Sequence, residues 1–404
     1  MSDDYLAERH HHLRAQVRQF AESRVAPRVP DIERTSVVET ELASAVAQRG
    51  WIGVTIDKAY GGMEAGHLAK TIIIEELSRV SGAMGAIAQA SQLGVAKIIH
   101  FGNDPQKQRW LPQIAAGSCL PTIAVTEPEA GSHVLGMQMT ARLEDDHYVL
   151  NGRKQYVGNS HIGDLHGVVA RTGQGSQGLT AFLVEADRPG LTLAPHTPHL
   201  GLHGFSFGEL HFTNCRIPIA SRLGREGQGL DVAYSSSVLY GRPNLTAVAL
   251  GIHQAILEET IRFTSERIRY GSPLHNLPNI KIKIGQLQSR VMTARLAAYH
   301  AAHLLDTGTA CDAELMNAKV TNVELALDSA RAAMEIHAAA GLHGDAPLSR
   351  YLRDAHHIFA PAGTSDVQWL RLADFALGQH KDQWSQRLST APTPPALIID
   401  GERA

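Results

Sequence analysis

Apolar residues recur every three or four positions over most of residues 4–118. The runs 72–77 and 87–99 are typical of helices, whose apolar face repeats about every 3.6 residues. Helix-breaking residues interrupt this pattern at Pro27, at Gly61 and Gly62, and at Gly102. We therefore expect residues 1–120 to form an N-terminal helical domain.

The pattern changes near residue 121, where short apolar runs alternate with turn residues such as Asn151-Gly152. Runs of this length between turn signals are typical of β-strands. They predict a middle β-domain over residues 121–225. The expected strands lie at 148–150, 167–170, 179–184 and 209–212.

Long amphipathic segments return after residue 226 and predict a C-terminal four-helix bundle over residues 226–385. The remaining residues, 386–404, carry three prolines and are expected to form a tail. The order of helical, β and helical segments predicts an α+β fold. The expected long helices lie at 245–268, 279–305, 312–340 and 364–379.

Composition narrows the range of partners. The 404 residues include 37 lysines and arginines against 40 acidic residues, so the net charge of −3 does not favour nucleic acid or an anionic membrane. Cys119, Cys215 and Cys311 are widely spaced and form no CxxC pair, which argues against a disulfide framework and a zinc site. We expect no metal. No leader-like or membrane-spanning run is present, and a cytoplasmic location is expected.

Four motifs in one order carry a family resemblance. They are residues 124–132 (Ala-Val-Thr-Glu-Pro-Glu-Ala-Gly-Ser), 151–156 (Asn-Gly-Arg-Lys-Gln-Tyr), 266–274 (Glu-Arg-Ile-Arg-Tyr-Gly-Ser-Pro-Leu), and 353–355 with 363–368 (Arg-Asp-Ala and Gly-Thr-Ser-Asp-Val-Gln). Together they resemble the acyl-CoA dehydrogenase family over nearly the whole chain. The resemblance implies that family's fold and an FAD-dependent reaction on an acyl thioester of CoA or a carrier protein.

The resemblance also implies a set of FAD-binding residues. Segments of the β-domain and of the C-terminal helices would hold the flavin, with Ser132 also near the substrate thioester. The residues carried over are Val125, Thr126, Gly131, Ser132, Tyr156, Gly158, Arg267, Tyr270, Glu335, Ala339, Thr364 and Asp366.

Two of these residues imply an oligomer. In the family pattern, Arg267 and Tyr270 would reach the FAD of a neighbouring subunit, where a guanidinium suits a pyrophosphate. A site shared across a two-fold interface needs at least two chains. A homodimer or homotetramer is therefore expected, and the electron acceptor is left open.

The chain departs from the family where catalysis would occur. The family removes the α-proton of the thioester with a glutamate, at one of two positions that here are Ala362 and Gly241. Tyr240 and Arg242 are the nearest candidate catalytic groups, and Arg242 is also a candidate substrate-binding residue. The cofactor side differs too, because Gly158 and the pair Ala338-Ala339 replace a threonine and two glycines.

Three functions fit this pattern. The first is a dehydrogenase for an unusual thioester, whose α-proton is already acidic or whose oxidised bond is a carbinol C–H. The second is a flavin-dependent monooxygenase, for which Gly158 would leave room for a flavin adduct. The third is a redox-neutral isomerase, cyclase or binding protein for a thioester.

Overall fold

The computed structural model describes residues 3–388, so most of the expected tail lies outside the described residues. The N-terminal part is helical, as its apolar period predicted. Helix α5 is buried along almost its whole length and starts at Ser81, whose hydroxyl accepts a hydrogen bond from the amide of Met84. The helices are α1 (Glu8–Phe20), α2 (Val29–Thr35), α3 (Glu41–Gln48), α4 (Gly66–Val80), α5 (Gly82–Phe101) and α6 (Asp104–Ala115).

The middle part is a sheet in the order β6-β7-β3-β2-β4-β5-β8, with β1 pairing to β4 in parallel. The register of β3 with β7 shifts between Lys154 and Val157. At this bulge Tyr156 adopts a positive φ of 58° and leaves its side chain 49% exposed. The strands are β1 (Pro121–Ala124), β2 (Thr140–Glu144), β3 (His147–Gly158), β4 (Leu165–Arg171), β5 (Leu179–Glu185), β6 (Leu191–Leu193), β7 (Phe207–Pro218) and β8 (Arg222–Leu223).

The C-terminal part is a helical bundle. A five-residue π-helical turn, η8 (Ser237–Gly241), joins α7 to α8, and the two-stranded hairpin of β9 (Ile268–Arg269) and β10 (Ser272–Pro273) joins α8 to α9. The helices are α7 (Gly229–Ser236), α8 (Arg242–Glu266), α9 (Pro278–Asp306), α10 (Asp312–His337), α11 (Pro347–His357), α12 (Ser365–Ala376) and α13 (Trp384–Arg387).

The succession of helices, strands and helices confirms the α+β fold, while the exact domain limits remain predictions. Among the helices, two details differ from expectation. Helix α11 was missed, and α13 crosses the expected start of the tail at residue 386. Helix α13 packs on the bundle because Asp312 accepts hydrogen bonds from the amides of Trp384 and Ser385, at 2.9 Å each.

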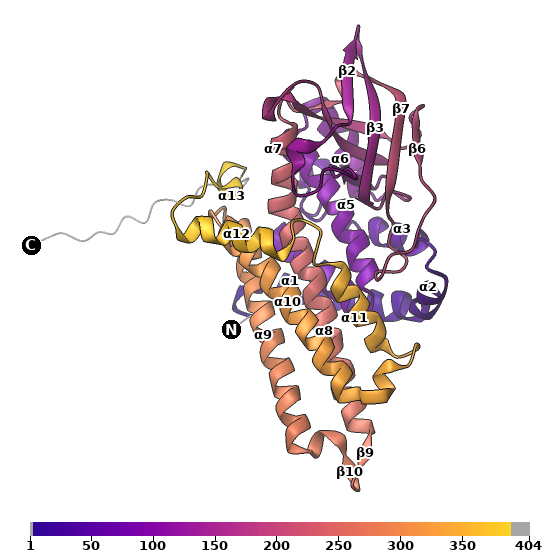
Figure 1. The fold of residues 1–404 in the computed structure, drawn as a ribbon, viewed down its shortest axis with the longest axis vertical. Coiled ribbons are helices and arrows are strands. Elements are labelled where there is room, and N and C mark those ends of the chain that lie inside the picture. Colours follow the sequence, from indigo (N-terminus) through magenta and orange to yellow (C-terminus); the bar gives the residue numbers. More distant parts are fainter. Residues whose placement is uncertain (1–2, 389–404) are drawn as a thin grey trace, which may run out of the picture.

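The sheet and the helical bundle lie at opposite ends of the molecule (Figure 1). Helix α12 crosses the upper end of the bundle near the sheet, whereas the β9–β10 hairpin forms its far tip. Among the residues described, no helix combines the length and the apolar character needed to cross a bilayer.

Candidate active site

The two positions at which the resemblance places a catalytic carboxylate meet in space. A Cβ atom built on Gly241 would lie 3.1 Å from the Cβ of Ala362 and 3.6 Å from a methyl carbon of Leu93. A side chain from either position would therefore enter the same space. Neither residue bears a carboxylate, so both positions at which the resemblance expects an acid lack one in the same space.

The loop that carries Ala362 is held by two buried side chains from α10 and α12. The ammonium of Lys319 donates to the carbonyls of Phe359 at 2.6 Å and Gly363 at 2.8 Å. The amide of Gln368 donates to the carbonyls of Ala362 at 2.9 Å and Gly363 at 3.1 Å. Within residues 3–388, no hydrogen bond engages the backbone N–H groups of Ala362 and Gly363. These two donors are free to bind a ligand oxygen.

Burial is the main cause that lowers the pKa of Lys319 to about 8, and the nearby cation of Arg242 is the second. A lysine in this environment remains a hydrogen-bond donor whether it is charged or neutral. Its two carbonyl contacts therefore fix the loop around Ala362. Sequence reasoning missed both Lys319 and Gln368, because their contacts join segments far apart in the chain and no local motif marks them.

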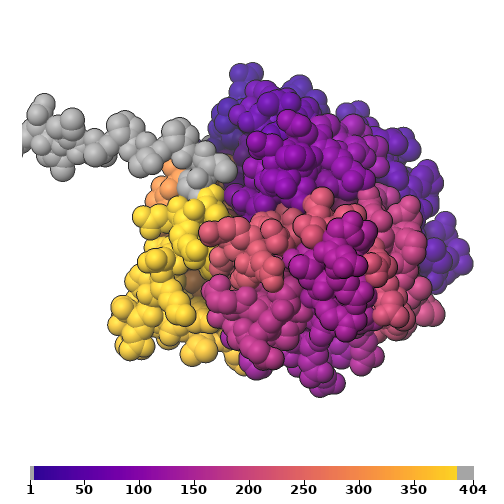
Figure 2. Space-filling model, turned by 90° about the horizontal axis from the view of Figure 1, so that it is seen from above, coloured from indigo at the N-terminus to yellow at the C-terminus, as the bar shows by residue number. Residues whose placement is uncertain are grey.

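Free hydroxyl groups come from both sides of the cleft between the β-domain and α12. Thr364 occupies the N-cap position of α12, but its side chain makes no capping bond. The hydroxyls of Thr126 and Ser132 also have no hydrogen-bond partner among the described residues. A Cβ built on Gly131 would meet nothing within 4 Å. The space-filling view shows the C-terminal segment, in yellow, beside the magenta-to-pink β-domain with a furrow between them (Figure 2).

These groups suit a flavin dinucleotide. Hydroxyls without partners, an open backbone at Gly131 and an exposed Tyr156 ring offer hydrogen bonds and an aromatic face to a flat polar ligand. Gln368 adds a buried side-chain oxygen that has no partner. Val125 contributes its carbonyl to Lys154, and Asp366 lies exposed in the first turn of α12.

The carboxylate of Glu127 lies in this region but is fully engaged. It accepts from the ammonium of buried Lys154 at 2.7 Å and from the amides of Gln138 at 2.6 Å and Met139 at 3.1 Å. All three donors come from the protein, so both carboxylate oxygens are committed to contacts within the β-domain. Glu127 therefore serves structure and is not the missing base.

The space next to Gly158 is filled. A Cβ atom built there would lie 2.9 Å from the Cβ of Ala90 and 3.0 Å from the Cζ of Phe205. Phe205 stacks on Phe207, whose ring lies 5.6 Å from that of Tyr156. The room that Gly158 was expected to provide is thus occupied by an aromatic group that sequence reasoning missed.

The structure does not support Tyr240 as a base. Its ring packs against His67 at 5.0 Å and His100 at 6.2 Å, with the ammonium of Lys70 at 4.1 Å from its centroid. Burial raises the pKa of Tyr240 to about 12. Tyr240 is therefore engaged by α4 and α5, and its phenol keeps its proton at neutral pH.

The remaining predicted cofactor residues lie at the other end of the bundle. Arg267 and Tyr270 belong to the β9–β10 hairpin at the far tip (Figure 1). Tyr270 is 92% exposed, and the guanidinium of Arg267 has no partner among residues 3–388. Glu335 pairs with Lys283 at 3.0 Å, near the exposed Ala339. One chain therefore divides the predicted cofactor residues into two groups that it does not bring together.

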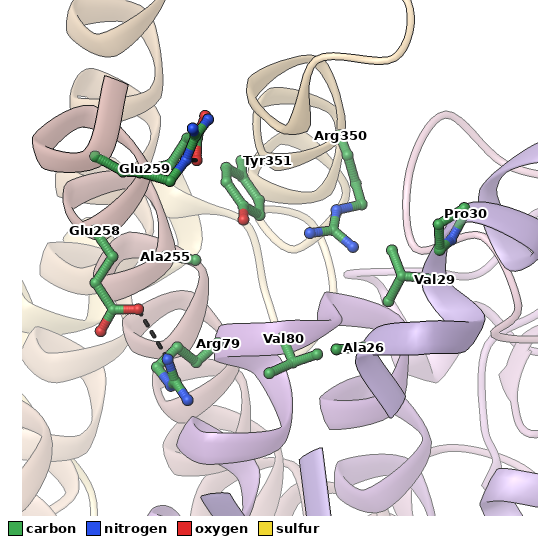
Figure 3. A pocket seen from close by; sticks show the side chains of 11 residues that line it. Ala26, Val29, Pro30, Arg79, Val80, Ala255, Glu258, Glu259, Arg350 and Tyr351 are labelled. Atoms are coloured by element: carbon green, nitrogen blue, oxygen red, sulfur yellow. Dashed lines mark hydrogen bonds and ion pairs between the residues drawn. The ribbon is translucent and has the colours of Figure 1, made fainter. Parts of the chain in front are cut away.

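A hollow of about 520 Å³ lies between α2, α4, α8 and α11. Figure 3 shows the side chains that line it. Its charged groups are largely paired with one another, as Arg79 is with Glu258 at 2.9 Å and Arg262 with Glu259 at 2.6 Å. None of the predicted site residues lines it. The hollow is therefore separate from the candidate active site.

Comparison with known families matches three consecutive domains. Residues 7–118 match the acyl-CoA dehydrogenase N-terminal domain, residues 122–215 the middle domain and residues 227–377 the C-terminal domain. An acyl-CoA dehydrogenase of Bacillus subtilis is 34% identical over 369 residues, which cover 91% of this chain and 97% of that protein. A 3-(aryl)acrylate reductase of Clostridium sporogenes is 31% identical over 91% of this chain and 98% of its own length.

Solved structures agree with these matches. Butyryl-CoA dehydrogenase from Megasphaera elsdenii superposes with a TM-score of 0.90 at 28% identity, covering 92% of this chain and 99% of that chain. The prolyl acyl carrier protein oxidase AnaB gives a TM-score of 0.87 at 28% identity with the same coverage. A structure of PigA with FAD and proline gives 0.86 at 26% identity, covering 93% of this chain and 98% of that chain.

Proposed function

Since the chain belongs to the acyl-CoA dehydrogenase family, we propose that it oxidises an acyl thioester whose reacting carbon needs no carboxylate from the protein. FAD is the cofactor of this dehydrogenase-like flavoenzyme. The observation that carries the proposal is the shared site of Gly241 and Ala362, where neither family position bears an acid.

FAD, when bound, accepts the hydride that leaves the substrate. The chain's own contribution is to hold the thioester. The free N–H groups of Ala362 and Gly363 are suited to bind its carbonyl oxygen and so to stabilise negative charge as it develops there. This polarisation acidifies the neighbouring C–H bond. A positioned base on the protein would raise the rate by about 10²–10⁴-fold. Where the protein offers no such base, the substrate must be activated by its own structure.

Two substrate classes meet this condition. One has an α-carbon between two electron-withdrawing groups, so that solvent removes its proton. The other loses hydride from a carbinol or amine-bearing carbon, where the lone pair of the heteroatom assists. Delivery by a carrier protein is supported by the similarity to AnaB, an oxidase of a prolyl carrier protein, and to PigA in complex with proline.

The oxygenase alternative is weakened by the side chains around Gly158. An oxygenase would need open space beside Gly158, whereas Phe205 and Ala90 fill the volume next to this residue. A redox-neutral function predicts that the thioester binds without reducing the cofactor. That outcome distinguishes it from the dehydrogenase.

We further propose a homodimer, or a dimer of such dimers, in which the hairpin of one subunit reaches the cofactor of the other. The unpartnered Arg267 and the exposed Tyr270 support this assignment. In this arrangement the two separate groups of cofactor residues complete one site between two chains.

The test compares two pantetheine thioesters without oxygen, because pantetheine is the arm common to CoA and carrier proteins. In 2-acetylbutyryl-pantetheine the α-carbon lies between two carbonyls, while in butyryl-pantetheine it does not. We expect the first to bleach the flavin absorbance and the second to leave it unchanged. Equal bleaching by both would contradict the proposal, and binding without any bleaching would favour the redox-neutral alternative.

A further inference from the structure

Arg242 is a buried cation without a partner. The residue is 7% exposed, and within residues 3–388 no hydrogen bond or ion pair engages its guanidinium. Its Nε atom is inaccessible to solvent and has no acceptor. Burial lowers the pKa of Arg242 to about 10, yet a group with this pKa remains charged at neutral pH. An uncompensated buried charge is costly unless a ligand neutralises it.

The groups around Arg242 do not supply the missing anion. Lys319 and Arg371 are themselves cations, and each lies close enough to Arg242 to interact with it unfavourably. The nearby carboxylate is Asp312, which already accepts from the amide and hydroxyl of Ser385 at 2.9 and 2.6 Å and from the amide of Trp384 at 2.9 Å. Asp312 thus anchors α13 and forms no ion pair with Arg242 among the described residues, although its charge is the one nearby that most favours the guanidinium.

The position of Arg242 relates it to the reacting end of the substrate. It is the first residue of α8 and directly follows Gly241, whose Cα faces Ala362. Arg242 lies close enough to Lys319 to lower the pKa of that lysine, and Lys319 in turn holds the carbonyl of Gly363. The unpaired guanidinium therefore lies next to the loop that lacks a carboxylate.

We propose that Arg242 binds a carboxylate carried by the acyl group of the substrate. The substrate class is then an acyl thioester with a second, free carboxylate, and Arg242 is a specificity-determining residue. This inference rests on the proposed function and adds the identity of the acyl group. A carboxylate matches the planar guanidinium in two hydrogen bonds and removes the cost of burying it unpaired.

A phosphate on the thioester arm is the other source of anionic oxygen. The pantetheine arm places its phosphate a long chain of bonds away from the thioester. Arg242, in contrast, adjoins Gly241 and Ala362 at the thioester end. The acyl carboxylate is therefore the better match, and a probe without phosphate separates the two.

The experiment measures binding of succinyl-pantetheine and butyryl-pantetheine to the FAD-loaded protein by calorimetry without oxygen. The variants are Arg242→Gln and, as a matched control, Arg350→Gln, since Arg350 also has a buried guanidinium nitrogen without a partner but lines the separate hollow. We expect the wild type to bind succinyl-pantetheine at least about ten-fold more tightly than butyryl-pantetheine, because a hydrogen bond between charged groups contributes at least that much. Arg242→Gln should lose this preference and Arg350→Gln should keep it. The milder variant Arg242→Lys should keep part of it.

Equal affinity of wild type for both probes would overturn the inference and leave the proposed function intact. Loss of affinity for butyryl-CoA relative to butyryl-pantetheine in Arg242→Gln would assign the guanidinium to a phosphate and also overturn it. Absence of binding of both thioesters to wild type would overturn the proposed function and this inference together.

Discussion

The two sides of the candidate cleft differ in how their buried cations are paired. On the β-domain side, Lys154 is completely buried and pairs with the carboxylate of Glu127 at 2.7 Å. On the helical side, Lys319 contacts only carbonyl oxygens and Arg242 contacts no partner among the described residues. The chain therefore keeps a structural carboxylate on one side and lacks a reactive carboxylate on the other.

This difference separates the scaffold from the chemistry. Lys154 and Glu127 hold the segment that carries Val125, while Lys319 and Gln368 hold the loop that carries Ala362. Both sets of contacts are present. The lack of a carboxylate at Gly241 and Ala362 is therefore not accompanied by a loss of the structure around them. Under the proposed function, the cleft binds and orients the thioester, and the substrate contributes the reactivity that a carboxylate would otherwise supply.

Restoring the base should have the largest effect. Ala362→Glu places a carboxylate in the space that positions 241 and 362 share. We expect flavin bleaching by butyryl-CoA to become faster by about 10²–10⁴-fold, the usual contribution of a positioned base. Ala362 has a φ of 56°, so a non-glycine residue already occupies the left-handed region in the wild type, and the variant keeps this strain. Anaerobic stopped-flow absorbance measures the rate.

The matched control is Ala360→Glu, which adds the same charge to an exposed position of the same loop. It should leave the rate unchanged. An equal gain in both variants would mean that charge alone, and not its position, accounts for the effect.

Breaking the ion pair of Lys154 and Glu127 on the β-domain side should lower the stability of the fold. Lys154→Met leaves Glu127 buried without its cation, which should lower the free energy of unfolding by about 3–5 kcal/mol. Arg142→Met removes an exposed partner of Glu144 and should cost less than about 1 kcal/mol. Urea denaturation of both variants gives the comparison. Similar losses would show that the Lys154–Glu127 pair is not a structural anchor.

The hairpin provides a third environment, in which the cation is exposed. Arg267→Ala should weaken FAD retention about ten-fold or more, because a charge-assisted bond to a phosphate is lost. Arg269→Ala is the control, since its side chain bonds the carbonyl of Ile268 in its own hairpin. Equilibrium dialysis measures the cofactor, and light scattering the mass. A monomer that retains FAD would refute the shared site.

The effect that is smallest per pH unit concerns Lys70, a buried lysine that contacts His67 and Tyr240, with Asp306 and His100 nearby. Burial lowers its pKa to about 7, whereas an unfolded lysine titrates near about 10.4. Between these values the unfolded chain binds more protons, so the free energy of unfolding should rise with pH. The slope should be at most about 1.4 kcal/mol per pH unit for this group.

Lys70→Met should flatten this slope, and Lys58→Met, at a position that is 75% exposed, should not. Urea titrations at pH values from 7 to 10 provide the measurement. A slope that is the same in Lys70→Met and wild type would show that Lys70 does not titrate in this range.

The sequence predicted the elements that depend on local pattern. Helices α8, α9, α10 and α12 lie where the apolar period placed them, because a long amphipathic face is recorded in residue order. Helix α11 was missed, since it is short and ends in two histidines. Strands β1, β2, β6 and β8 were also missed, because runs of two to five residues carry little period.

The site was only partly predictable. The lack of a carboxylate at Ala362 and Gly241 followed from the family resemblance, but only the fold shows that these two positions meet. The filling of the space beside Gly158 by Phe205 could not be predicted from the sequence, because it brings the end of β3, the segment before β7 and Ala90 of α5 together. The same holds for Lys319, whose carbonyl partners lie in a distant loop.

Exchange of the α-hydrogens of butyryl-CoA in D₂O tests the absence of a protein base most directly, because exchange requires proton removal but no hydride transfer. The FAD-loaded wild type should incorporate deuterium no faster than buffer alone, as measured by mass spectrometry of the recovered thioester. Ala362→Glu should accelerate the incorporation. Rapid exchange by wild type would show that another group removes the proton and would contradict the account.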